Sequence, residues 1–154
     1  MDRTPLTRLH LEEGSKVRLR MFQHEFKHGI QVVKVFDPEM PLITANGSEL
    51  NQIWTNLIDS AIDAKSGMPP GTKRLENRTV CELGCAMVEI VDNGPGISEE
   101  VQAHIFNPFF TTKPVGERTG LGLDIVQRIA QKHEAAIQVE SQPGRTAFQV
   151  RLPI

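Results

Sequence analysis

The strongest constraint on the fold is an apolar stripe in the first half of the chain. Apolar side chains recur every three or four residues at Leu50, Ile53, Trp54, Leu57 and Ala61. This spacing places them on one side of a helix. Ser48 precedes the stripe as a candidate N-cap, with Glu49 in the first turn. The pattern predicts a long amphipathic helix that ends near residue 65 and packs its apolar side on a sheet.

Strand patterns lie on both sides of this helix. Alternating or β-branched runs predict strands at 30–36, 42–45, 74–82, 86–91, 137–141 and 148–152. Two further helices are expected at 98–105 and 121–133, with a loop at 107–118. Because parallel βαβ alternation is absent, we expect an α+β fold, a two-layer α/β sandwich with a mixed sheet covered by helices on one face. Residues 1–28 are expected to be a leading helix or linker, and residues 29–154 the domain itself.

Composition and charge exclude several functional classes. With 39% hydrophobic and 23% charged residues, the chain has a globular balance. Its formal net charge of -2 provides no basic field for nucleic acid or an acidic membrane. No apolar run approaches the ~20 residues that span a bilayer, and Cys81 and Cys85 fit no zinc spacing. We expect a cytoplasmic domain, monomeric in isolation, without nucleic-acid or direct membrane contact.

A polar row follows the apolar stripe along the long helix. Its members, three or four residues apart, are Gln52, Asn56, Ser60 and Asp63. Carboxamide, hydroxyl and carboxylate oxygens are the ligands that Mg²⁺ accepts beside phosphate oxygens. The same spacing is also typical of a solvated helix flank.

A second candidate element is the run Asp92-Asn93-Gly94-Pro95-Gly96, which follows a predicted strand. The carboxylate could accept a hydrogen bond from an exocyclic amine such as that of adenine, and the glycines let the backbone turn and approach a ligand. An Asx-type turn is the alternative interpretation.

A third candidate element, Thr119-Gly120-Leu121-Gly122-Leu123, opens the second long helix. Free N–H groups at a helix N-terminus form a site for phosphate. A flexible hinge is the alternative interpretation.

The order and spacing of these elements resemble those of sensor histidine kinase ATP-binding domains, of the GHKL superfamily. Residues 56–64 resemble the N box, 92–97 the G1 box, 105–113 the F box and 119–123 the G2 box, and residues 141–148 resemble the C-terminal hairpin. The likeness covers residues 29–154. The Phe-Phe-Thr-Thr-Lys stretch at 109–113 separates it from gyrase and MutL-type proteins.

The resemblance implies a Bergerat-type fold that binds ATP with Mg²⁺. It implies that Asp92 binds the adenine amino group, that Gly94 and Gly96 shape the pocket, and that Thr146 supports the base through water. It also implies that the loop at 107–118 is a lid. The residues expected at the phosphates or elsewhere in the ATP site are Lys113, Thr119, Gly120, Leu121, Gly122, Leu123 and Asp63. Asn56 and Ser60 occupy the two positions nearest Mg²⁺.

Several positions depart from the family pattern. Ser60 stands where the family usually has Asn, so its shorter side chain predicts a weakened Mg²⁺ position. Glu134-Ala135 replaces the usual Gly-Gly after the last helix and removes a favourable left-handed cap. His133, just before it, is interpreted as structural. Neither His24, despite the Glu that follows it, nor any other histidine has the context of a phosphoacceptor.

The resemblance therefore predicts the catalytic domain of a two-component sensor histidine kinase. It would position Mg·ATP for transfer to a histidine on a dimerisation domain absent from this chain, and a response regulator would receive the phosphoryl group later. A catalytically weak nucleotide-binding regulatory or interaction module remains the alternative. A gyrase or MutL-type ATPase is disfavoured, because no Glu in the N box can act as a catalytic base.

Overall fold

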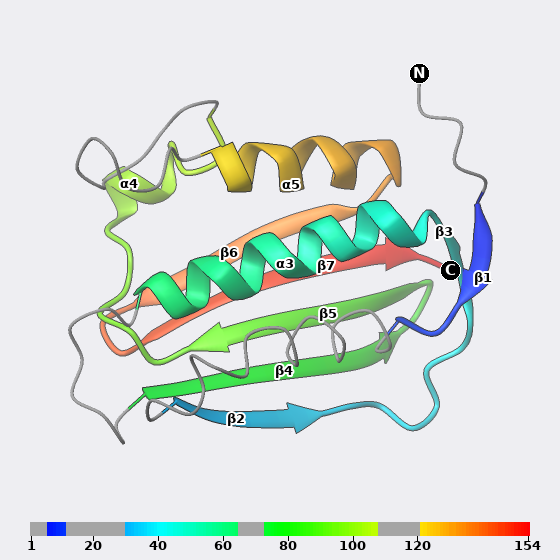
Figure 1. Ribbon diagram of the computed structural model, residues 1–154, viewed down its shortest axis with the longest axis horizontal. Helices are drawn as coiled ribbons and strands as arrows, with labels where there is room; N and C mark the ends of the chain where they lie inside the picture. The colour runs from blue at the N-terminus through cyan, green and yellow to red at the C-terminus, as the bar shows by residue number, and fades with distance from the viewer. Residues whose placement is uncertain (1–5, 12–29, 65–72, 108–120) are drawn as a thin grey trace.

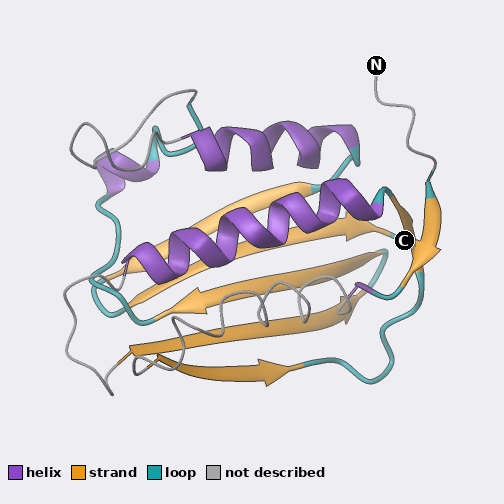
Figure 2. Cartoon of the chain, in the orientation of Figure 1, coloured by secondary structure: helices purple, strands orange, loops and turns teal. Residues whose placement is uncertain are grey.

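The computed structural model describes residues 6–11, 30–64, 73–107 and 121–154. In these segments two long helices cover one face of a five-stranded sheet (Figures 1 and 2). The strands, in spatial order, are β2 (Ile30–Val35), β4 (Lys73–Glu82), β5 (Cys85–Asp92), β7 (Arg145–Pro153) and β6 (Ala136–Gln142). Only the β2–β4 pair is parallel. The predicted α+β sandwich with a mixed sheet is confirmed.

Helix α3 (Gly47–Ala64) carries the largest part of the core. The predicted stripe is at most 1% exposed at every position, and Ile58 beside it is fully buried. Burying a large apolar side chain stabilises a fold by about 1.5–3 kcal/mol. The apolar face of α3 therefore makes a large contribution to the stability of this domain.

The N-cap of α3 is Asn46, so the prediction of Ser48 is wrong. Asn46 Oδ1 accepts a hydrogen bond from the Glu49 N–H over 3.1 Å, and its carbonyl accepts the Leu50 N–H. Asn and Ser are equally good caps. The helix begins two residues earlier because Asn46, directly after strand β3, accepts these two N–H groups of its first turn.

Helix α5 (Leu121–Lys132) packs against α3 and the edge strand β6. His133, directly after it, links the two helices: its Nδ1 donates to the Ile129 carbonyl over 3.0 Å, while its Nε2 accepts the Asn46 N–H over 3.2 Å. These contacts agree with a structural role. The next residue, Glu134, has a φ of 54° and takes the left-handed position that ends the helix.

The leading segment does not match the expected helix or linker where the structure describes it. Strand β1 (Thr7–Leu9) pairs antiparallel with β3 (Ile43–Ala45), and Leu11 is 1% exposed in the core. Residues 12–29 of that prediction lie outside the described residues. The early chain is thus part of the packed domain.

A single carboxylate fastens the β2–β3 connection to the sheet. Asp37 accepts the main-chain N–H groups of Cys81, over 2.7 Å, and of Glu39, over 3.0 Å. These hydrogen bonds to the charged form, that from Cys81 first, hold the pKa of Asp37 below its ordinary value.

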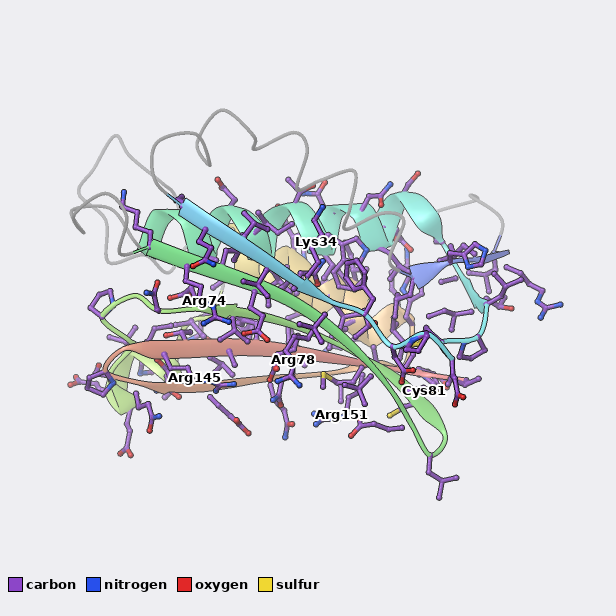
Figure 3. The ribbon with its side chains drawn as sticks, turned by 90° about the horizontal axis from the view of Figure 1, so that it is seen from below. Lys34, Arg74, Arg78, Cys81, Arg145 and Arg151 are labelled. Carbon is purple, nitrogen blue, oxygen red and sulfur yellow. The ribbon has the colours of Figure 1, made fainter. Side chains whose placement is uncertain are left out.

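The other face of the sheet carries charged side chains. Glu89 lies at its centre and is 4% exposed. Gln149 Nε2 donates to Glu89 over 2.7 Å, and the guanidinium groups of Arg78 and Arg145 lie 3.7 and 3.8 Å from its oxygens. Figure 3 shows Arg78, Arg145 and Arg151 on this face, away from α3. The long arginine side chains cover the sheet here.

Candidate functional site

Asp92 ends strand β5 on the face of the sheet that the helices cover. It is 2% exposed, and its Oδ1 accepts the Gly94 N–H over 2.8 Å. This hydrogen bond forms the Asx-type turn that was the alternative interpretation of this run in the sequence. The turn holds the carboxylate in a fixed orientation at the end of the sheet, where it can also serve as an acceptor for a ligand.

The loop after Asp92 is fastened to the β6–β7 hairpin. The Gly144 N–H donates to the Gly94 carbonyl over 3.1 Å. Gly96 has a φ of +93°, and a Cβ there would lie 2.6 Å from the Gln142 carbonyl oxygen. Only glycine fits such an approach. Gly96 is therefore required by contact with the hairpin, whereas Gly94 is absent from the positive-φ residues of the described segments.

Asp92, Thr146 and Ser141 form a row across three neighbouring strands. Asp92 on β5 is in register with Thr146 on β7, which is in register with Ser141 on β6. Thr146 is 3% exposed, and its Oγ1 lies 2.7 Å from Ser141 Oγ. Ser141 also accepts the Ile97 N–H over 2.7 Å. Sequence analysis did not select Ser141, whose inward position in an alternating strand was the only available signal.

The short helix α4 (Glu99–Gln102) closes the same loop. Ser98 caps it by accepting the Val101 N–H over 3.2 Å, and the helix is shorter than the predicted 98–105. Gln102 Nε2 donates to the Ile97 carbonyl over 2.7 Å. The loop 92–97 is therefore hydrogen-bonded on both sides.

Asn56, in the polar row of α3, contacts the beginning of α5. Its Nδ2 donates to the Gly122 carbonyl over 2.8 Å, while its Oδ1 accepts from Gln52 Nε2 over 2.9 Å. A Cβ on Gly122 would lie 3.7 Å from the Asn56 amide, an ordinary contact. The polar row and the glycine-rich helix start, predicted separately, meet at this point.

Ser60 follows Asn56 by one helical turn and is half-buried like it. Leu123 is half-buried in the first turn of α5. Asp63 and Leu121 belong to α3 and α5, but their side chains lie outside the described residues. Lys113, Thr119, Gly120 and the expected lid at 107–118, apart from its first residue, also lie outside them.

The candidate residues gather at one end of the domain. Figure 1 shows the end of β5, the beginning of β7, α4 and the beginning of α5 at this end. Ile154 lies at the opposite end of the sheet, where its N–H donates to the Gly84 carbonyl in the β4–β5 turn. The site is therefore built from loops and helix residues beside the strand ends at one end of the sheet.

The donor set of the polar row suits a hard cation. Asn56 and Ser60 offer a carboxamide and a hydroxyl oxygen one turn apart, and such oxygens bind Mg²⁺. Within the described segments, no three His, Cys, Asp or Glu side chains are grouped for a metal. No helix among them is long and apolar enough to cross a membrane.

Comparison with known proteins identifies the group to which these features belong. Residues 45–154 match the model of the family described as histidine kinase-, DNA gyrase B-, and HSP90-like ATPase. The sensory histidine kinase/phosphatase NtrB of Vibrio alginolyticus is 36% identical over 148 residues, which cover 90% of this chain and 41% of that protein. NtrB of Rhodobacter capsulatus is 35% identical over 136 residues, 80% of this chain and 37% of that protein. The chain thus spans about two-fifths of these relatives.

Solved structures share the fold over nearly the whole chain. The catalytic domain of histidine kinase ThkA is 28% identical with a TM-score of 0.85, covering 99% of this chain and 96% of that one. The mycobacterial sensor histidine kinase MprB is 28% identical with a TM-score of 0.80, covering 96% and 97%.

Proposed function

Because the chain belongs to the histidine kinase-, DNA gyrase B- and HSP90-like ATPase family, we propose that it positions Mg·ATP for phosphoryl transfer to a histidine. It is an ATP-binding catalytic domain of the sensor histidine kinase type. The acceptor histidine is supplied by a helical dimerisation domain, since no histidine of this chain has an acceptor context. A response-regulator aspartate then takes the phosphoryl group.

The row Asp92–Thr146 carries the proposal for the adenine pocket. Asp92 accepts the exocyclic amine of adenine, which donates hydrogen bonds. Thr146, beside it in register, supports the base through a water. The observation that favours this assignment is the burial of both polar side chains, 2% and 3% exposed, at a sheet end. Internal hydrogen bonds, from Gly94 to Asp92 and between Ser141 and Thr146, hold both side chains in position for a ligand.

The hydrogen bond from Asn56 to Gly122 carries the proposal for the phosphates. It holds Asn56 of the polar row of α3 against the first turn of α5. The free N–H groups at a helix N-terminus form a site for an anion. Gly120 to Leu123 therefore bind phosphate oxygens through the main chain, together with Lys113 and Thr119. Asp63, further along the polar row of α3, also belongs to this ATP-binding set.

Asn56 and Ser60 would hold Mg²⁺, which neutralises phosphate charge when it is bound. The Asn56 oxygen now accepts from Gln52 and would exchange this N–H for the ion. The chain's own contribution is positioning, because holding the γ-phosphate beside a nucleophile removes much of the entropic barrier. Stabilisation of the developing charge comes from the helix N-terminus.

Ser60 supports a second candidate function. A hydroxyl is a shorter ligand than the carboxamide usual at this position, so Mg·ATP would be held less well. The chain would then act as a catalytically weak nucleotide-binding module that regulates or docks a partner.

Phosphoryl transfer separates the two candidates. The chain is mixed with radiolabelled Mg·ATP and a separate helical hairpin that carries the acceptor histidine, with a His→Gln hairpin as control. Label on the hairpin with histidine, and none on the His→Gln hairpin, supports the kinase. ATP binding with no label on either hairpin supports the regulatory module, and no ATP binding contradicts both.

A further inference from the structure

Ser141 is the side chain that joins the 92–97 loop to the Thr146 hydroxyl. Its Oγ accepts the Ile97 N–H over 2.7 Å and lies 2.7 Å from Thr146 Oγ1. A main-chain hydrogen bond from Gly144 to Gly94 also joins the loop to the hairpin. Ser141 differs from this contact because its side chain reaches a side chain of the proposed adenine pocket.

The direction of the Ser141–Thr146 hydrogen bond follows from counting protons. Each hydroxyl has one proton to donate. Beside Thr146 the site presents a carboxylate, Asp92, and, in the bound base, the ring nitrogen N1 next to the exocyclic amine. Both are acceptors. If Thr146 donated its one proton to Ser141, it would have none left to donate to Asp92, to N1 or to a water between them.

The count is the same when one water lies between Thr146 and the base. A water that bonds Asp92 and N1 uses both of its protons on these acceptors. It can contact Thr146 only by accepting, so Thr146 has to donate to it. The hydrogen bond between the two hydroxyls must then use the Ser141 proton, with Thr146 Oγ1 as its acceptor.

We propose that Ser141 is a positioning and specificity residue: it donates to Thr146 and so directs the Thr146 O–H toward the water that donates to the adenine ring nitrogen N1. The relay runs from the Ile97 N–H to Ser141, from Ser141 to Thr146, and from Thr146 through this water to the base. This inference rests on the proposed adenine site. The relay would make the pocket select a base that has a hydrogen-bond acceptor beside its exocyclic amine, as adenine does.

Matched variants test the relay. Ser141→Thr keeps the hydroxyl, whereas Ser141→Val introduces a side chain of the same shape as threonine without the hydroxyl. Both residues are common in strands. Calorimetry on the full chain gives the affinities for ADP and for 1-deaza-ADP, which lacks the N1 acceptor. Thermal melting of each variant checks the fold, and Ser141→Ala replaces the Val variant if that one does not fold.

The relay predicts that Ser141→Val weakens ADP binding by about threefold and leaves 1-deaza-ADP binding unchanged. Ser141→Thr should keep the wild-type ratio of the two affinities. In a Thr146→Val background, Ser141→Val should no longer change this ratio. An equal loss for both nucleotides, or no loss, overturns the proposal while the adenine site stands. Failure of the wild-type chain to bind ADP overturns both.

Discussion

The side chain of Asn56 donates to the main-chain carbonyl of Gly122 over 2.8 Å and joins segments 66 residues apart in sequence. Gln52 donates to the oxygen of the same amide over 2.9 Å. The two bonds hold the amide in one orientation, with its nitrogen toward α5. One side chain therefore contributes both to the packing of α3 on α5 and to the proposed phosphate site.

Replacing Asn56 by Asp should destabilise the domain in the absence of nucleotide. The new carboxylate oxygen would face the Gly122 carbonyl with no proton to share, and a lost hydrogen bond to a half-buried acceptor costs about 1–3 kcal/mol. Urea unfolding measures the change in the free energy of unfolding. Asn51→Asp, the same chemical change on the same helix, serves as the control. Equal stability of Asn56→Asp and wild type would show that the bond to Gly122 contributes nothing.

Ser60→Asn should strengthen nucleotide binding only when Mg²⁺ is present. The longer carboxamide oxygen reaches further from the helix than the hydroxyl. We expect a rise of about tenfold in ATP affinity, equivalent to about 1.4 kcal/mol, measured by calorimetry with magnesium and again with EDTA. A rise of the same size in EDTA would assign the effect to direct contact with the nucleotide.

Comparing alanine variants of two glycines distinguishes the cost of backbone strain from the cost of a steric clash. Gly84 and Gly96 both have positive φ, +80° and +93°, but a Cβ at Gly84 meets nothing within 4 Å. Gly84→Ala should therefore cost about 1–2 kcal/mol, the price of the left-handed conformation alone. At Gly96 the Cβ would lie 2.6 Å from the Gln142 carbonyl.

We expect Gly96→Ala to cost about 3 kcal/mol or more and to abolish ADP binding, because the loop must leave the hairpin. Chemical denaturation and ADP titration of the two variants make the comparison. Similar losses of stability in Gly84→Ala and Gly96→Ala would contradict the close approach to Gln142.

Glu134→Gly should stabilise the chain. Glu134 adopts a left-handed backbone conformation, with φ 54°, just after α5. The Ala135 N–H donates to the Ala130 carbonyl over 2.8 Å, which is typical of a helix that ends with such a residue. Glycine takes this conformation without the cost of a Cβ, a gain of about 1 kcal/mol. The midpoint of thermal unfolding should rise by about 3 °C. Glu140→Gly, in a strand, should lower it, and a drop in Glu134→Gly would refute the cap.

Elements with a strong local pattern could be predicted from the sequence. The apolar stripe predicted α3 because helical spacing and burial coincide at all five of its positions, the first being Leu50 and the last Ala61. The terminal hairpin followed from alternation around Pro143-Gly144. Asn46 was missed because Asn, Gly and Ser in succession are all acceptable near a cap, and their order does not show which one follows the end of β3 and accepts the Glu49 N–H.

Elements that depend on distant partners could not be predicted. Thr7–Leu9 forms a strand only because Ile43–Ala45 lies beside it, and a short strand without its partner has no local signature. Ser141 joins Ile97, 44 residues away, so its role is invisible in its own neighbourhood. The carboxylate of Asp92 could be proposed because a strand followed by Asp-Asn-Gly is a local signal.

Binding of ADP to the wild-type chain and to Asp92→Ala tests the central claim most directly. Calorimetry should show a wild-type complex and at least a tenfold weaker one for Asp92→Ala, since a hydrogen bond to a charged group contributes about 1.5–3 kcal/mol. Glu140→Ala, an exposed carboxylate on β6, is the control and should bind as wild type does. Thermal melting confirms that each variant is folded. If the folded wild-type chain ignored millimolar ADP, or if Asp92→Ala bound it equally well, the proposed nucleotide site would be wrong.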